Sequence, residues 1–402
     1  MRDLQGVLLC SGSGSRMKPL TTPKCLLPVV GVPMFLYPLS SILRAGIKDI
    51  KIFVRDTNEP ILKTEVEKSG LLKQFNANIE YIKITSSHDD FGTGDLLRHY
   101  HNRFTHDLLI VSCDFVSDSS LIPFVEFFRA YEATLVALVD DNCANSPAPG
   151  PKVKKAKATD LIAMDEETGQ LAYLCGDDDF DGVVGTEKFV DKFPKLSLTS
   201  KYNDCHVYAV RNSVLQSLNK NFISFKADFV PFLIESQFDE NSTTSCFAYR
   251  LPHENGTVTA HANTTGAYFE VNKEILKSFN RLMPAKGNGL TFNYRTDKIA
   301  MNDSRIESTT KVGKDSVIKR SVVLNTCQIG EKVKLKESLI LNNVIIGNGA
   351  SITNSIICDD VEIGDNAEVI NCIVTSGQKV AAKAKVQNEV VEDDDDGGWT
   401  DD

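Results

Sequence analysis

The 402-residue chain is 42% hydrophobic and 24% charged, and its formal net charge is -10. This length and apolar content provide enough core for one large or two medium globular domains. The acidic balance argues against a general nucleic-acid binder and against a protein attracted to an anionic membrane. No apolar run approaches the length of a membrane span, and the N-terminal MRDLQG lacks the apolar region of a secretory signal.

The ten cysteines are scattered as singletons, without a C-x-x-C pair. Several of them, such as Cys10, Cys113 and Cys327, stand in apolar, strand-like runs. Such cysteines are typical of buried, reduced thiols and not of a disulfide framework or a zinc site. We therefore expect a protein of the cytosol.

Predicted strands and helices alternate along the first part of the chain. The strands are apolar throughout, which is typical of a mostly parallel sheet with helices on both faces. Pro38 falls inside the first predicted helix, where it would remove a backbone hydrogen bond or kink the helix. The predicted strands are 6–10, 47–54, 78–84, 108–112 and 133–139, and the predicted helices are 33–45, 58–72, 92–104 and 119–131.

A loop of small residues follows the first strand, in the string VLLCSGSGSRMKPLTTPKCLLP over residues 7–28. Glycines such as Gly12 and Gly14 allow a sharp turn and a close approach to a ligand, and consecutive N–H groups can form an anion-binding nest. Arg16 and Lys24 add cations suited to phosphate. The loop could therefore hold a nucleoside triphosphate at the carboxyl edge of the sheet. A Ser/Gly turn with two surface cations is the alternative.

The ordered string over residues 9–25 resembles the signature of the nucleotide-diphospho-sugar pyrophosphorylases, which join a nucleoside triphosphate to a sugar phosphate with the help of magnesium. Ser11 stands where that signature has its first glycine, Ser15 replaces a threonine, and Cys25 replaces the final proline. The span between Thr21 and Pro23 is two residues short. The resemblance therefore implies a relative whose loop has lost the geometry of the enzymes.

Two further stretches resemble this family. Residues 91–96 resemble the segment that helps to hold the nucleotide base, with Gly94 in place of an alanine. Asp114 matches the strand-end aspartate that holds magnesium in the enzymes, with Cys113 in place of a glycine. A cap or turn residue before Ser119 is the alternative for Asp114. The second metal aspartate has no match, and residues 189–194 have the wrong spacing for the sugar-binding motif and read as a helix end.

The middle of the chain contains a strand, two helices and three polar stretches. A basic loop at 142–159 and an acidic cluster at 177–181 both favour solvated loops. The strand is predicted at 205–210 and the helices at 213–218 and 225–237. The segment 246–304 reads as a linker with a helix at 267–282.

From Val312 onward the sequence repeats every 17 residues. Each repeat carries an apolar residue followed by glycine, a small residue and an apolar pair. Such short repeats bury their apolar face only when they stack, and about six residues per face predict a parallel β-helix of the hexapeptide type. Hairpins would not explain the constant period. The aligned pairs are Val312-Gly313, Ile329-Gly330, Ile346-Gly347 and Ile363-Gly364.

The sequence thus predicts an α/β, nucleotide-diphospho-sugar transferase-like domain over 1–245, a linker with a helix over 246–304, a left-handed β-helix over 305–391 and a disordered acidic tail over 392–402. This plan resembles that of the gamma and epsilon subunits of eukaryotic translation initiation factor 2B, and also that of mannose-1-phosphate guanylyltransferases. The run from Ser376 to Val390 is similar to the close of the gamma subunits. The chain stops shortly after its repeats, so we expect it to lack the C-terminal exchange domain of the epsilon subunits.

Membership in the gamma-subunit family would imply a non-catalytic, accessory role in the exchange of GDP for GTP on initiation factor 2. It would also imply pairing with the epsilon subunit and assembly with the alpha, beta and delta subunits, without a membrane, direct nucleic-acid contact or cofactor. We expect no catalytic residue and no metal. The expected residues of a vestigial nucleotide site are Gly12, Gly14, Arg16, Lys24 and Asp114.

Overall fold

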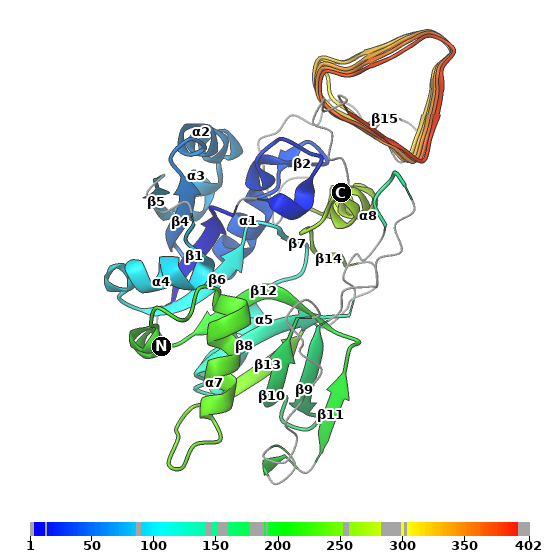
Figure 1. Ribbon diagram of the computed structural model, residues 1–402. Helices are drawn as coiled ribbons and strands as arrows, with labels where there is room; N and C mark the ends of the chain where they lie inside the picture. Colours follow the sequence, from blue (N-terminus) through cyan, green and yellow to red (C-terminus); the bar gives the residue numbers. More distant parts are fainter. Residues whose placement is uncertain are drawn as a thin grey trace, which may run out of the picture.

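The computed structural model contains an α/β unit and a three-sided β-helix that stacks against it (Figure 1). It confirms the predicted fold class of a mostly parallel sheet followed by a parallel β-helix. The residues that the structure describes are 4–12, 14–85, 90–141, 147–151, 160–176, 189, 192–193, 195–251, 257–282, 299–300 and 304–392.

A seven-stranded sheet organises the α/β unit. Its strands all run parallel except β12, which is antiparallel to both of its neighbours. The loops that follow β1 and β6 therefore meet at one edge of the sheet, where α/β proteins bind their ligands. In spatial order the strands are β13 (Cys246–Arg250), β8 (Leu135–Asp140), β12 (Asn203–Val210), β6 (Asp107–Ser112), β1 (Leu4–Cys10), β4 (Asp49–Arg55) and β5 (Asn78–Ile84).

Helices cover both faces of this sheet, as the apolar strands predicted. Neighbouring side chains of β1 enter different cores, with Leu8 on one face and Val7 on the other. The first face packs against α1 (Leu36–Arg44), α2 (Glu59–Ser69), α5 (Ile122–Ala130) and α8 (Thr265–Leu282). The second packs against α4 (Thr93–His99), the π-helical turn Phe225–Phe229 and α7 (Val230–Ser236).

Two predicted helices differ from the structure for local reasons. Helix α1 begins at Leu36 and not at Pro33, so Pro38 lies in its first turn, where a proline removes no intrahelical hydrogen bond. The helix predicted over 58–72 ends at Ser69, because Gly70 adopts a left-handed conformation with φ of 72°. A short helix, α3 (Leu71–Phe75), follows it.

The segment 246–304, expected to be a linker, contributes to the α/β unit. Strand β13 extends the main sheet, β14 (Thr259–His261) pairs with β7 (Phe115–Ser117), and α8 confirms the helix expected there. The polar composition of this stretch did not indicate β13 and β14, two short strands that are stabilised by pairing with neighbouring strands. The remaining strands of the unit are the antiparallel set β10 (Leu171–Cys175), β9 (Leu161–Asp165) and β11 (Leu196–Thr199), and the pair β2 (Pro28–Val29) and β3 (Val32–Pro33).

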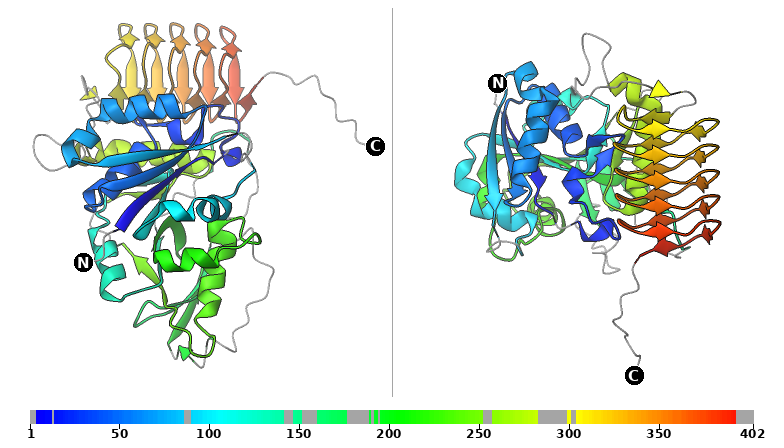
Figure 2. Two further views of the ribbon diagram at one scale, coloured as in Figure 1. Left: turned by 90° about the vertical axis from the view of Figure 1, so that its left-hand side faces the viewer. Right: turned by 90° about the horizontal axis from the view of Figure 1, so that it is seen from above.

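From β16 onward the C-terminal strands stack in parallel register, each residue pairing with the residue 17 positions later, for example Ile329 with Ile346 (Figure 2). Strand β15 pairs antiparallel with β16. The first side contains β15 (Ile299–Ala300), β16 (Ser304–Ile306), β19 (Val322–Val323), β22 (Leu339–Ile340), β25 (Ile356–Ile357), β28 (Ile373–Val374) and β31 (Val390–Val391). The second contains β17 (Lys311–Val312), β20 (Gln328–Ile329), β23 (Ile345–Ile346), β26 (Glu362–Ile363) and β29 (Lys379–Val380). The third contains β18 (Val317–Lys319), β21 (Lys334–Lys336), β24 (Ser351–Thr353), β27 (Glu368–Ile370) and β30 (Lys385–Gln387).

The first side of the β-helix packs against the α/β unit. In its apolar pairs the second residue points into the β-helix, whereas the first, such as Leu339 or Ile356, joins the core that contains α8. Tyr268 of α8 is buried there and donates a hydrogen bond to the carbonyl of Pro28 at 2.8 Å. On the loop after β8, the Gly150 N–H donates to the carbonyl of Asn371 at 2.8 Å. The two units therefore share one continuous core.

Several expectations fall on parts of the chain that the structure does not describe. These are the basic run at 152–157, the acidic cluster at 177–181 and the acidic tail beyond residue 392. Within the described ranges, no helix has the length and apolarity needed to cross a membrane. All of the described cysteines except Cys175 are buried, as their apolar surroundings predicted.

Candidate functional site

The carboxyl ends of β1 and β6 bring together two of the residues expected at a nucleotide site. Lys24 lies in a 3-10 turn, Lys24–Leu26, that returns across the sheet edge. Asp114 follows β6 directly and is fully buried. The Lys24 ammonium forms an ion pair with the Asp114 carboxylate. The described structure therefore places Asp114 in an ion pair inside the protein, and not as a cap for the segment at Ser119.

Three groups surround the Asp114 carboxylate. Besides the Lys24 ammonium, His261 Nε2 lies 3.0 Å from Oδ2, and the Ser112 hydroxyl donates to Oδ1. Burial acts to raise the pKa of Asp114, but the charges of His261 and Lys24 outweigh it and hold this pKa well below its ordinary value. Burial likewise acts to lower the pKa of Lys24, and Asp114 reverses the effect, so that the pKa of Lys24 is raised.

The small-residue loop itself contains one glycine that the backbone requires. Gly14 has φ of 69° at the start of the turn Ser15–Met17, a conformation that other residues seldom adopt. A side chain on Gly14 would also approach the Cβ of Lys24 to 3.2 Å. Gly12 is exposed, and a Cβ on it would meet no atom within 4 Å. Arg16 is exposed at the same loop and lowers the pKa of Lys24 through its charge.

Two histidines that the sequence analysis did not select complete this edge. A bulge in β12 between Asp204 and Tyr208 turns His206 into a left-handed conformation with φ of 54°. The ring of His206 lies 4.1 Å from that of His261, measured between centroids. Burial, followed by the proximity of His261, lowers the pKa of His206 well below its ordinary value. No sequence signal marked His261, because it lies in the stretch expected to be a linker.

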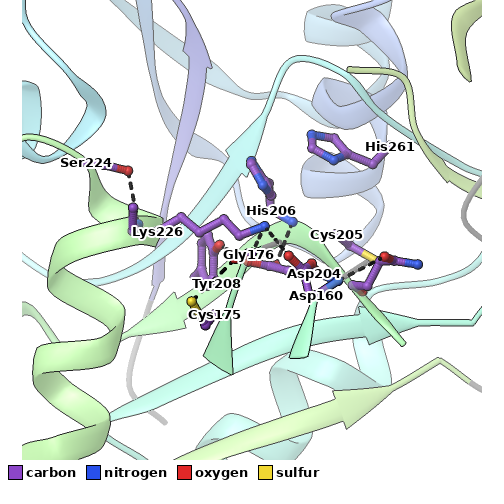
Figure 3. Close-up of polar contacts among 12 residues, drawn as sticks. Asp160, Cys175, Gly176, Asp204, Cys205, His206, Tyr208, Ser224, Lys226 and His261 are labelled. Atoms are coloured by element: carbon purple, nitrogen blue, oxygen red, sulfur yellow. Dashed lines mark hydrogen bonds and ion pairs between the residues drawn. The ribbon is translucent and has the colours of Figure 1, made fainter. Parts of the chain in front are cut away.

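A second charged cluster continues from the bulge (Figure 3). Lys226 Nζ lies 2.9 Å from Asp160 Oδ1 and 3.9 Å from Asp204 Oδ2. The Asp204 N–H donates to Asp160 at 2.6 Å, and the Tyr208 hydroxyl donates to Asp204. Burial raises the pKa of Asp204, which Lys226 offsets only in part. In both charged clusters the carboxylates therefore face a lysine of the same chain.

The segment that resembles a base-binding motif also contacts its own chain. The Gly94 N–H donates to the carbonyl of Ile223 at 2.8 Å. A Cβ on Gly94 would come within 2.4 Å of the Phe222 carbonyl, and a Cβ on Gly92 within 2.3 Å of the Ile223 carbonyl. The segment 222–223 thus covers the start of α4 at a distance that only glycine permits.

A divalent metal has no suitable set of ligands among the residues that the structure describes. No group of three or more His, Cys, Asp or Glu side chains could hold an ion there. Magnesium prefers several oxygen ligands, whereas Asp114 faces an ammonium group and an imidazole. Residues 190, 191 and 194 of the stretch that resembles a sugar-binding motif lie outside the described part. Its described residues Phe189 and Phe193 pack in a small apolar cluster, as a helix end would.

Comparison with known proteins identifies relatives for both units. Residues 5–146 match the family model described as nucleotidyl transferase. Residues 293–387 match the model described as the eIF2B subunit epsilon LbH domain, a left-handed β-helix. Both agree with the fold described above.

Similar whole proteins include two gamma subunits of translation initiation factor eIF2B. The one from Caenorhabditis elegans is 64% identical over 327 residues, which cover 80% of each chain. The one from Schizosaccharomyces pombe is 23% identical over 310 residues, covering 68% of this chain and 66% of the relative. Mannose-1-phosphate guanylyltransferase 1 of Arabidopsis thaliana is 24% identical over 242 residues, covering 58% and 57%.

Proposed function

Because this chain belongs to the family of translation initiation factor eIF2B gamma subunits, we propose that it acts as the gamma subunit of that factor in the cytosol. In this role it supports the exchange of GDP for GTP on initiation factor 2. It pairs with the epsilon subunit and joins the alpha, beta and delta subunits. The 64% identity to the Caenorhabditis elegans gamma subunit carries this proposal.

The chain contributes structure to the exchange reaction and not catalytic groups. Its nucleotidyltransferase pocket is vestigial, because the carboxylate that would hold magnesium is neutralised by Lys24 and His261. The start of α4, where the enzymes hold the base, is covered by the carbonyls of residues 222 and 223. These contacts argue against the alternative function, a mannose-1-phosphate guanylyltransferase-like enzyme, which the more distant similarity to the Arabidopsis protein would otherwise favour.

Purification of the tagged full chain from cytosol under gentle conditions, followed by mass spectrometry, tests the assembly. We expect recovery of an epsilon subunit together with alpha, beta and delta subunits and initiation factor 2. Exchange of labelled GDP on initiation factor 2 should be faster with epsilon plus this chain than with epsilon alone. Recovery of a homo-oligomer without these partners would contradict the proposal.

A turnover assay tests the vestigial pocket separately. The purified chain is incubated with GTP or UTP, magnesium and several sugar 1-phosphates, and pyrophosphate release is measured. We expect none above the level of Asp114→Asn. Release that this substitution abolishes would establish the alternative enzyme, whatever the purification shows.

A further inference from the structure

We propose that the Lys24 ammonium and the His261 imidazole occupy the place of a divalent cation at Asp114, so that an internal ion pair and not a metal holds this edge of the sheet together. The inference goes beyond the proposed function, because it concerns the metal response of the isolated chain. It can hold or fail whichever partners the chain has.

The arrangement around Asp114 already supplies what a buried carboxylate requires. The side chain has no exposed surface, and an uncompensated charge at such a position would be strongly destabilising. Lys24 provides a full positive charge, and the turn Lys24–Leu26 holds its backbone above the strand ends. His261 Nε2 lies 3.0 Å from Oδ2, the oxygen that also faces Lys24, and the Ser112 hydroxyl donates to Oδ1. No charge is left for a metal to neutralise.

The same groups also exclude a metal. An ammonium group cannot act as a ligand, and in contact with Asp114 it repels a dication. His261 lies 3.0 Å from Oδ2 and offers a ring nitrogen, whereas magnesium prefers several oxygen ligands. The ring of His206 lies 4.1 Å from that of His261, measured between centroids, and adds a further nitrogen-bearing side chain, not a carboxylate, to this edge.

Two other carboxylates of this region contact groups of the same chain. Asp160 accepts a hydrogen bond from the Asp204 N–H, and both carboxylates face the Lys226 ammonium (Figure 3). Tyr208 donates its hydroxyl to Asp204. Asp160 and Asp204 therefore have partners within the chain, as Asp114 does.

The first measurement uses the wild-type chain and Asp114→Asn. Binding of Mn²⁺ is followed by the electron paramagnetic resonance signal of the free ion, and thermal unfolding is recorded in Mg²⁺ and in EDTA. We expect no Mn²⁺ binding that depends on Asp114, and the same unfolding midpoint in both buffers. Mn²⁺ binding to wild type that Asp114→Asn removes would overturn the proposal, even if no other variant folds.

The second measurement rebuilds the metal site. Lys24→Met removes the ammonium, and His261→Asp places a second carboxylate beside Asp114. The double variant should bind Mn²⁺ at least about ten-fold more tightly than wild type, because cation affinity rises with the number of carboxylate ligands. Mg²⁺ should raise its unfolding midpoint. Lys24→Met alone should be destabilised in EDTA and partly restored by Mg²⁺.

Lys51→Met is the matched control. Lys51 Nζ lies 2.6 Å from Glu80 in an ion pair between β4 and β5, where Glu80 is partly exposed and also pairs with Arg103. This variant should lose stability without gaining Mn²⁺ affinity or a response to Mg²⁺. A folded double variant that binds Mn²⁺ no better than this control would overturn the proposal.

Discussion

At the scale of single residues, charge and space explain the departures from the enzyme signature. Asp114 is retained, but burial obliges it to find a positive partner, and Lys24 and His261 provide it. Gly94 stands where the pyrophosphorylase motif has an alanine, because the Phe222 carbonyl lies where a Cβ would be. Asp114 and Gly94 therefore both serve contacts within this chain.

Replacing Gly94 by alanine, the residue of the pyrophosphorylase motif at this position, should destabilise the protein. Gly94→Ala places a Cβ within 2.4 Å of the Phe222 carbonyl, so the backbone of 222–223 must move. We expect the free energy of unfolding in urea to fall by about 1–3 kcal/mol, the usual cost of overpacking. Gly12→Ala is the control, because its Cβ would meet no atom within 4 Å, and it should change stability by less than about 0.5 kcal/mol. Equal effects of the two substitutions would refute this explanation.

At the scale of elements, the β-helix depends on the alternation of side chains within each coil. Val323, Ile340, Ile357 and Val374 form a column inside it, one residue from each coil. Asn354, Asn371 and Asn388 turn one corner in left-handed conformations and form a side-chain ladder. Asparagine tolerates this conformation better than most residues, which explains its recurrence at that corner.

Truncation inside this column should cost far more than truncation outside it. Ile357→Ala removes a fully buried side chain, and we expect the free energy of unfolding to fall by about 2–5 kcal/mol. Ile345→Ala alters a residue that is 43% exposed on the second side, and the loss should stay below about 1 kcal/mol. Chemical denaturation followed by circular dichroism measures both. A similar loss in the two variants would show that the coil interior is not the source of stability.

At the scale of the whole molecule, the α/β unit and the β-helix behave as one body because they share a core. Three side chains on the first side of the β-helix point away from its interior and pack in the core that contains α8: Leu339, Ile356 and Ile373. Asn371 also donates to the carbonyl of Gly150 at 3.1 Å, beside the reciprocal bond from the Gly150 N–H. The β-helix is therefore held in a defined position, as an assembly subunit requires.

A charge in this shared core should separate the two units. Leu339→Asp buries an unpaired carboxylate where the side chain is now 1% exposed, at a cost of about 3–5 kcal/mol. We expect the radius of gyration from small-angle X-ray scattering to increase and thermal unfolding to split into two transitions. Lys336→Asp, on the third side of the β-helix, should leave both measurements unchanged. An unchanged scattering curve for Leu339→Asp would contradict the shared core.

The sequence by itself determined the β-helix and the class of the main sheet, because both depend on local patterns of apolar residues. The β-helix follows from apolar pairs every 17 residues, and the parallel sheet from continuous apolar strands that alternate with helices. The sequence also marked Lys24 and Asp114. Only the tertiary structure decided that these two neutralise each other, that His261 from a supposed linker joins them, and that residues 222–223 cover Gly94. These contacts join segments far apart in the chain, and long-range packing has no period that a sequence displays.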